Sequence, residues 1–385
     1  MNPSKPIYLD YNATTPLTSE VIGAMLPFLE EHFGNPSSTH PYGQVTHKAV
    51  EKARAHVARL IQAKAEEIIF TSGGTESNNL AIRGLAKTLG GKGNHIITSA
   101  IEHPAVTEVC QVLANHGFEI TTLPVDSCGK VSPSDLEAAL KPDTILVSVM
   151  HANNEVGTIQ PIKNLAALAH EAGALFHTDA AQSAGKLPVD VIALGVDLLS
   201  IAGHKLYAPK GVGALYIRKD VQLEKIIFGA GQEHGLRPGT ENVLEIVGLG
   251  QAAQQAGRDL ENNISHFETM RDRLQAGLEA ALPPGSLRLN GHPVDRLPNT
   301  VNLSFKGVEA NALLDEIQDG VAASAGAACH AGQVKISSVL SAMGVPIQWA
   351  KGTVRFSVGR MTTTAEIDQA VEIIIRAILK LQRKK

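Results

Sequence analysis

Cysteine is scarce in this chain: only 3 of its 385 residues are cysteines, at positions 110, 128 and 329. No Cys-x-x-Cys pair is present and the count is odd, so we expect neither a disulfide framework nor a metal site. Cys110, in AVTEVCQVLANHG, is expected to be a small core residue of an amphipathic helix, and Cys128, in VDSCGKV, to belong to a turn. Cys329 lies in a different kind of segment and is considered below.

The chain also lacks a basic field and long apolar runs. Its net charge is −4, and no cluster of lysine and arginine is interleaved with aromatic residues, which make up only 4% of the chain. We therefore expect no nucleic-acid partner. No apolar run approaches the ~20 residues that a membrane-spanning helix needs. The start, MNPSKPIYLDYN, has no secretory pattern, so a cytoplasmic protein that does not bind membranes is expected.

The first large segment alternates strand-like and helix-like stretches. The chain is 44% hydrophobic and 19% charged, an ordinary globular composition. Short β-rich runs separated by helical patterns predict crossover units and an α/β fold with a mostly parallel sheet covered on both faces. The expected strands lie at residues 67–70, 95–100, 119–125, 144–150, 174–179, 196–202 and 213–219.

The second segment predicts a smaller α/β unit. A long helical pattern over residues 240–282 ends at LPPG. It is followed by the strand-like TVNLSF, a helix near 309–318, the strand-like VRFSVG and a final helix, TAEIDQAVEIIIRAILKLQ. We predict a large domain of residues 15–255 and a small domain formed by residues 1–14 and 256–385.

Glycine and threonine mark the first strand-to-helix junction, FTSGGTESNN. Gly73, Gly74 and Thr75 stand where free amides of a helix N-terminus, close backbone approach and a hydroxyl would cradle a phosphate. No Gly-Lys-Ser/Thr follows, so this is not a Walker motif. On these residues alone, an ordinary tight turn explains the junction equally well.

Polar side chains also follow the later strands. They are Asn153, Asn154 and Glu155 in HANNEVG, Asp179 and Gln182 in HTDAAQ, His204 and Lys205 in GHKLYAPKG, and His103 at a helix start. Each has a simple structural explanation: a turn asparagine, a helix-capping aspartate, or a solvated loop lysine. Parallel strands, however, bring their carboxyl ends to one edge of the sheet. A phosphate cradle, an aspartate for a ring nitrogen and a Schiff-base lysine together predict a pyridoxal phosphate site.

A dinucleotide site is the competing interpretation. GLGQAA at residues 248–253 loosely fits the pattern Gly-x-Gly-x-x-Ala. It lies within a helical pattern and not after a strand, so the match is weak.

Eight motifs give this chain a specific resemblance. LDYNATTP, GNPSSTH, TSGGTESNN, HANNEVG, HTDAAQ, GHKLYAPKG, RPGTEN and VRFSVGR occur in the order found in cysteine desulfurases of the class V aminotransferase group. The chain resembles that family over essentially its whole length. The resemblance implies the aspartate-aminotransferase-like fold (fold type I), pyridoxal 5′-phosphate as cofactor, a homodimer, and release of alanine from L-cysteine with a protein-bound persulfide.

The resemblance assigns expected roles position by position. Lys205 is expected to bind the cofactor covalently and Asp179 to pair with its ring nitrogen. His103 is expected to stack over the ring and to take part in catalysis, and Asn154 and Gln182 to contact the ring oxygen. The residues expected near the phosphate are Gly74, Thr75, Ala202 and His204, with Thr240 at the phosphate of the other subunit. The residues expected at the substrate are Asn12, Asn154 and Arg355. The planar fork of arginine suits a substrate carboxylate.

Two positions depart from the family pattern. The family usually has a serine where this chain has Ala202, so we expect one phosphate hydrogen bond fewer. The family's mobile loop commonly carries a proline where this chain has Ile336. These departures bear on cofactor affinity and loop stiffness, not on the type of reaction.

Cys329 lies in the small-residue segment AASAGAACHAGQVKISSVL. Such a composition favours an accessible loop thiol, and only a thiolate is nucleophilic, so His330 is a candidate to assist it. An accidental free thiol is the alternative. The resemblance makes Cys329 the residue that accepts sulfur and passes it to an acceptor such as an iron–sulfur scaffold protein.

The substrate stays open between two candidates. GAACH and Ala202 resemble selenocysteine lyases, whereas most desulfurases have a Gly-Ser-Ala-Cys sequence. We favour cysteine because desulfurases are the commoner relatives. A third possibility is a non-catalytic, cofactor-bearing platform for partner proteins, and the presence of Lys205 and Asp179 argues against it.

Overall fold

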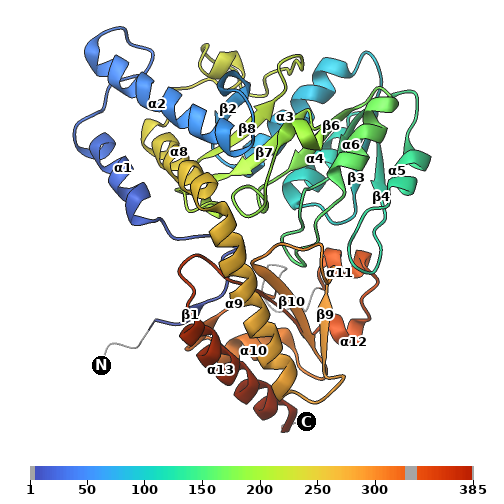
Figure 1. The fold of residues 1–385 in the computed structure, drawn as a ribbon. Coiled ribbons are helices and arrows are strands. Elements are labelled where there is room, and N and C mark those ends of the chain that lie inside the picture. Colours follow the sequence, from blue (N-terminus) through green and yellow to red (C-terminus); the bar gives the residue numbers. More distant parts are fainter. Residues whose placement is uncertain (1–4, 326–335, 384–385) are drawn as a thin grey trace.

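A computed structural model describes residues 5–325 and 336–383. Figure 1 shows a large mixed sheet with helices around it in one half of the molecule, and a smaller sheet with long helices beside it in the other half. None of the helices in the described ranges is both long and apolar enough to span a membrane.

The large sheet has seven strands in the order β2-β8-β7-β6-β5-β3-β4. All neighbouring pairs are parallel except those of β8, which is antiparallel to β2 and to β7. The strands are β2 (Ile68–Thr71), β3 (His95–Ser99), β4 (Glu119–Leu123), β5 (Thr144–Ser148), β6 (Leu175–Asp179), β7 (Leu198–Ala202) and β8 (Gly213–Ile217). The prediction of a mostly parallel α/β sheet is confirmed.

Helices cover both faces of this sheet. They are α1 (Ser19–Glu30), α2 (Pro41–Leu60), α3 (Gly74–Leu89), α4 (Pro104–Ala114), α5 (Pro133–Ala139), α6 (Ile162–Glu171), α7 (Val191–Leu194) and α8 (Val243–Arg258), with short 3-10 turns η1 (Ala65–Glu67), η2 (Gly203–Lys205) and η3 (Glu233–Gly235). Successive strand residues enter different cores: Leu198 packs with α3 and α4, whereas Leu199 packs with α2, α6 and α8. This alternation is why the strands are apolar on both faces.

The second half has its own core around a three-stranded antiparallel sheet, in the order β12-β10-β9. Its elements are β9 (Leu287–Asn290), β10 (Thr300–Phe305), β12 (Thr353–Ser357), α9 (Leu260–Ala281), α10 (Ala310–Ile317), α11 (Ser338–Ala342), α12 (Ile347–Ala350) and α13 (Thr364–Arg383). Strand β1 (Ile7–Tyr8) pairs in parallel with β11 (Val321–Ala322), so β1 joins this half.

The predicted helix over 240–282 is two helices. The backbone at Asp259 leaves the helical region (φ −106°, ψ 14°) and ends α8, and α9 begins at the next residue. The Asp259 carboxylate forms two hydrogen bonds with the guanidinium of Arg258. GLGQAA lies inside α8, so the strand-turn-helix context of a dinucleotide site is absent there.

Candidate active site

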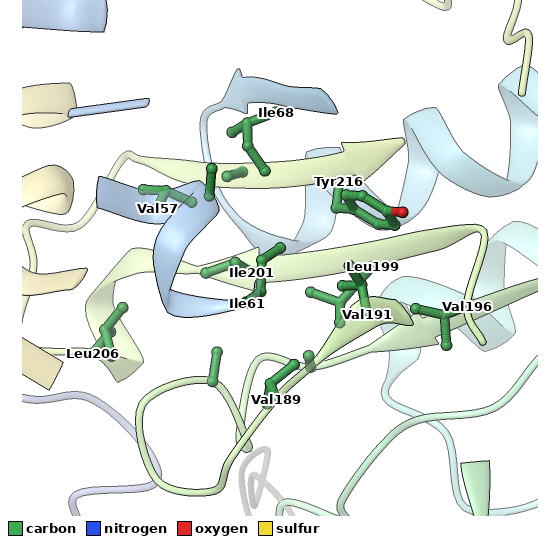
Figure 2. Close-up of a cluster of buried hydrophobic side chains, with 14 of the residues drawn as sticks. Val57, Ile61, Ile68, Val189, Val191, Val196, Leu199, Ile201, Leu206 and Tyr216 are labelled. Carbon is green, nitrogen blue, oxygen red and sulfur yellow. The ribbon is translucent and has the colours of Figure 1, made fainter. Parts of the chain in front are cut away.

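Strand β7 delivers Lys205 to the carboxyl edge of the sheet. Leu199 and Ile201 point into the buried cluster shown in Figure 2, and Leu206, just beyond η2, is buried in the same cluster. Lys205 therefore lies between two anchored apolar residues, Ile201 and Leu206. A lysine held in this way is not a freely solvated loop charge.

A cavity of about 240 Å³ opens at this edge and brings together most of the predicted site residues. Those that line it are Asn12, Gly74, Thr75, His103, Asn154, Asp179, Gln182, Ala202, His204, Lys205 and Arg355. They come from strand ends, helix starts and the N-terminal segment, as expected where parallel strands end together. Their roles toward a bound group remain predictions.

The Lys205 amine faces two main-chain oxygens. Its Nζ donates to the carbonyl oxygens of Asn12 at 2.6 Å and Ala13 at 2.7 Å. Burial, followed by the positive charge of Arg355, lowers the pKa of Lys205 to about 8, while Asp10 and Asp179 oppose the shift. Roughly a tenth of Lys205 is therefore the neutral, nucleophilic amine at pH 7, far more than for a solvated lysine.

Asp179 ends β6, and its carboxylate is oriented by two donors. Asn78 Nδ2 donates to Oδ2 at 2.7 Å, and the Ala181 amide donates to Oδ1 at 2.9 Å. The side chain is buried at the cavity wall. A carboxylate fixed in this way can pair with one protonated ring nitrogen.

His103 caps the start of α4 and lines the same cavity. The Ala105 amide donates to His103 Nδ1 at 3.1 Å, so Nδ1 is an acceptor. Burial lowers the pKa of His103, the charge of Lys205 lowers it further, and Asp179 acts in the opposite direction. The ring is therefore held mainly neutral, with the proton on Nε2, which suits stacking and proton transfer.

The junction between β2 and α3 leaves the first amides of a helix beside a hollow, as an anion cradle requires. Gly73, with φ +149°, caps α3, and no side chain caps the first amides of the helix. An adjoining hollow of about 440 Å³ is lined by Gly74, Thr75, His204 and Lys210, among others. Helix N-terminal amides, a hydroxyl and a lysine are favourable partners for a phosphate. Burial lowers the pKa of His204 to about 4, so the imidazole is neutral there.

Arg355 lies on β12 and reaches the cavity from the second half of the chain. Its guanidinium donates to Asp10 Oδ1 at 2.7 Å and to the Asn154 carbonyl oxygen at 2.9 Å, whereas its buried Nε has no protein partner. The side chain of Arg355 also lines the cavity, where its positive charge faces any bound group. Asn153, by contrast, stabilises the turn that follows β5, because its Oδ1 accepts from the amides of Glu155 and Val156.

Asn12 and Gln182 form the base of the cavity. The side-chain carboxamide of Asn12 is bound to Thr300 and Asn299 at 2.8 and 2.9 Å. The main-chain carbonyl oxygen of Asn12 accepts from Gln182 Nε2 at 3.0 Å. Asn12 therefore offers the cavity its main chain more than its side chain. Gln182 keeps a second N–H on Nε2.

Two predicted site residues are not among the cavity-lining residues. Thr240 is exposed beyond η3. Cys329 falls in 326–335, outside the described residues. The residues that flank this stretch adjoin the site: Ser324 pairs with Arg355 through the main chain, and Ser337 Oγ donates to Glu155 Oε2 at 2.5 Å.

The structure also adds two polar residues that the sequence analysis missed. Asn78, one turn into α3 from Gly74, binds Asp179. Lys186 is only 4% exposed and binds Gln182. The spacing from Gly74 to Asn78 places both on one helical face and was available as a signal, whereas Lys186 carries no signal in the sequence because its burial depends on tertiary packing.

The donor set fits pyridoxal phosphate. Its phosphate would be held by the α3 amides, Thr75 and His204, its ring nitrogen by Asp179 and its ring oxygen by Gln182. Lys205 would supply the amine for the covalent link, and the guanidinium of Arg355, which lines the cavity, would meet a carboxylate. A cavity with these groups defines a pyridoxal-phosphate-dependent enzyme of fold type I.

Comparisons with known proteins agree with this class. The class-V aminotransferase family model matches residues 7–370, so the chain belongs to this pyridoxal-phosphate-dependent family. The chain is similar to the cysteine desulfurase IscS of Dictyoglomus turgidum, with 50% identity covering 98% of this chain and 96% of that protein.

Two solved structures share the fold. A NifS-like protein has a TM-score of 0.91 at 38% identity, with 97% of this chain and 99% of that chain covered. SspA, solved in complex with cysteine, has a TM-score of 0.80 at 37% identity, with 92% and 99% covered.

Proposed function

We propose that the chain is a cysteine desulfurase that converts L-cysteine to L-alanine and retains the sulfur as a persulfide on Cys329. The observation that carries the proposal is the placement of the Lys205 amine, with its lowered pKa, in one cavity with Asp179 and Arg355. Relatives at high identity are named cysteine desulfurases, and SspA was solved with cysteine.

The residues divide the chemistry among them. Bound pyridoxal phosphate supplies an electron sink for the amino-acid carbons. Arg355 orients the substrate carboxylate, and Lys205 moves the α-proton as a general base. Asp179 holds the proton of the ring nitrogen, and His103 lies over the ring and serves in proton transfer.

Cys329 takes the sulfur. Its thiolate forms an S–S bond with the substrate sulfur while the substrate C–S bond breaks; the bonding electron pair stays on carbon, and protonation completes alanine. Ser324 and Ser337, described residues on either side of Cys329 in the sequence, are bound to Arg355 and Glu155. Cys110 is unsuited to this role because burial raises the pKa of its thiol to about 12.

A homodimer completes the proposal. One face of α1 carries Ile22, Leu26 and Leu29, which are 51%, 45% and 65% exposed and recur at helical spacing. Phe33 and Tyr42, 82% and 61% exposed, extend the apolar surface toward α2, which lies with α1 at one side of the molecule (Figure 1). Burial of this surface against a second copy would be favourable. Thr240 is then available to the partner's phosphate.

The remaining proposals concern the chain's setting. We place the protein in the cytoplasm because a reducing compartment keeps the Cys329 thiol free to accept sulfur. The recipient of the sulfur is an acceptor protein, such as an iron–sulfur scaffold. We also propose a large domain of residues 15–255 and a small domain of 1–14 with 256–385, supported by two separate cores that contain residues such as Ala253 and Phe267 respectively. Ala256 packs in the first core, so the break between α8 and α9 at Asp259 is the better-supported boundary.

Turnover by a Lys205→Ala variant tests the function. The wild-type protein with pyridoxal phosphate should be yellow and release alanine from cysteine, and Lys205→Ala should lose both properties. Loss of a positioned acid–base group alone costs about 10² to 10⁴-fold, and loss of the covalent link adds to this. The exposed lysine Lys92, changed to alanine, is the control. Near-normal alanine release by Lys205→Ala would show the proposal to be wrong.

A further inference from the structure

Lys186 is a buried lysine beside the cofactor cavity. It lies in the turn after β6, four residues beyond Gln182, and is 4% exposed. Gly185 has φ +74°, and a Cβ at this position would lie 2.1 Å from Leu206 Cδ1. The turn is therefore packed tightly against the residue that follows Lys205. The Lys186 Nζ donates to Gln182 Oε1 at 2.8 Å.

The contacts of Gln182 determine which way its carboxamide points. A lysine ammonium only donates, so the atom that faces Lys186 is the amide oxygen. On the other side, the Asn12 carbonyl oxygen only accepts, and Gln182 Nε2 donates to it at 3.0 Å. Both partners select the same orientation. The second N–H of Gln182 Nε2 is therefore presented to the cavity, which Gln182 lines.

The charges around Lys186 are predominantly positive. Within the part of the chain that the structure describes, no carboxylate pairs with Lys186, and the charged groups that act on it most are Lys205 of η2 and Arg355 of β12. Burial and these two cations lower the pKa of Lys186 to about 7. Of the nearby acids, Asp10 is bound to Arg355, and Asp179 faces Lys205. A site with this excess of positive charge favours the binding of an anion.

We propose that Lys186 is a positioning residue for Gln182. It fixes the Gln182 carboxamide with an N–H group toward the cavity and places a positive charge behind that group. The cavity then binds the ring oxygen of pyridoxal phosphate as an anion. The inference rests on the proposed function, which places the cofactor ring at Gln182. A buried ammonium without a carboxylate partner is costly, and an apolar side chain of similar length would avoid that cost. With a pKa of about 7, about half of Lys186 is charged at pH 7, and an anionic ring oxygen beside Gln182 would favour the charged form, so the charge is expected to act on the bound cofactor.

The pH titration of the yellow chromophore that pyridoxal phosphate forms with Lys205 tests this role. The chromophore loses a proton from its nitrogen, and a nearby cation lowers the pKa of that loss. Lys186→Met removes both donor and charge and should raise this pKa by about one unit or more, and it should weaken cofactor binding about tenfold. Lys186→Gln keeps a donor without the charge, so it should raise the pKa with a smaller loss of affinity. Lys186→Arg should return the pKa toward the wild-type value.

Arg271→Met is the matched control, because Arg271 is a buried cation of α9 that does not line the cavity. Its chromophore should titrate as in the wild type. An unchanged chromophore pKa in both Lys186→Met and Lys186→Gln would overturn the proposal, as would failure of both variants to fold, which would make Lys186 a structural residue. A wild-type protein that forms no Lys205-dependent chromophore would instead refute the proposed function.

Discussion

Asn78 Nδ2 donates a hydrogen bond of 2.7 Å to Asp179 Oδ2, and the main-chain amide of Ala181 binds the other carboxylate oxygen at 2.9 Å. This pair joins the first turns of α3, where the phosphate is expected, to the end of β6, where the ring nitrogen is expected. One hydrogen bond thus joins the two elements that are expected to hold opposite ends of the cofactor.

Asn78→Ala should weaken cofactor binding. A hydrogen bond to a charged group contributes about 1.5–3 kcal/mol, so its loss corresponds to roughly 10- to 150-fold in the dissociation constant. Asn78→Asp should be worse, because it puts a like charge beside Asp179. Titration of the cofactor-free protein with pyridoxal phosphate measures the effect. Asn164→Ala, at an exposed asparagine of α6, is the control. Equal affinity of all these proteins would contradict a role for the pair.

The rate at which the cofactor-free protein binds pyridoxal phosphate covalently should rise with pH around a midpoint of about 8. The pKa of Lys205 is lowered to about 8 from its ordinary value of 10.5, and only the neutral amine attacks. Arg355→Met removes a cation that lowers this pKa, so it should move the midpoint upward. Asp10→Asn should move it downward. Stopped-flow absorbance at a series of pH values measures the midpoints. A midpoint near 10.5 in the wild type would mean that Lys205 behaves as a solvated lysine.

Ala202→Ser should tighten cofactor binding about 2- to 10-fold, because a new hydrogen bond contributes roughly 0.5–1.5 kcal/mol. Ala202 lines the cavity, and a Cβ built on Gly74 would lie only 3.2 Å from Ala202 Cβ. A hydroxyl at residue 202 would therefore stand beside the α3 amides. Ala202→Val adds bulk without a hydroxyl and should weaken binding. If the serine variant binds no more tightly than wild type, another group already occupies that place.

Mixed dimers test whether Thr240 serves the neighbouring subunit. Lys205→Ala dimers should be inactive and Thr240→Ala dimers weakly active. In a hybrid, the subunit that retains Lys205 receives an intact Thr240 from its partner, so mixing should restore activity above that of either parent. No gain after subunit exchange would place Thr240 at its own subunit's phosphate.

Cys329→Ala should abolish alanine release from cysteine while the protein stays yellow. The substrate C–S bond breaks readily only when a thiolate accepts the sulfur, whereas selenium leaves selenocysteine more easily, so substantial selenocysteine cleavage should persist. Cys128→Ala, a partly exposed cysteine outside the cavity, should turn over normally. Mass spectrometry after cysteine treatment should find the extra sulfur on Cys329. Persulfide on Cys110 or Cys128, or full cysteine turnover by Cys329→Ala, would refute the mechanism.

The sequence predicts the site well where strand order alone brings residues together. Asp179 and Lys205 follow the neighbouring strands β6 and β7, so their convergence follows from parallel pairing. Gly74 follows β2, which pairs with β8 and so lies two places from β7. The seven strands of the large sheet all overlap their predicted ranges, because each is a short apolar run between turn residues.

Tertiary packing accounts for what the sequence did not predict. In the sequence, Lys186 has the pattern of an exposed lysine in a turn. Its burial in the structure follows from the close packing of Gly185 against Leu206. The end of α8 at Asp259 interrupts a helical pattern that continues on both sides, so periodicity alone does not locate it. The short strand β9 has a mixed sequence, LRLN, and is defined by its pairing with β10.

The ion pair between Asp10 and Arg355 joins residues 345 positions apart in the chain. On a ribosome that adds about 5–20 residues per second, Asp10 is synthesised roughly 20 to 70 seconds before its partner exists. The large sheet can fold during that interval, but the wall of the cavity that binds the substrate carboxylate cannot. A nascent chain can therefore acquire its cofactor-binding edge before it can hold an amino acid, and the site becomes complete only after Arg355 has been synthesised.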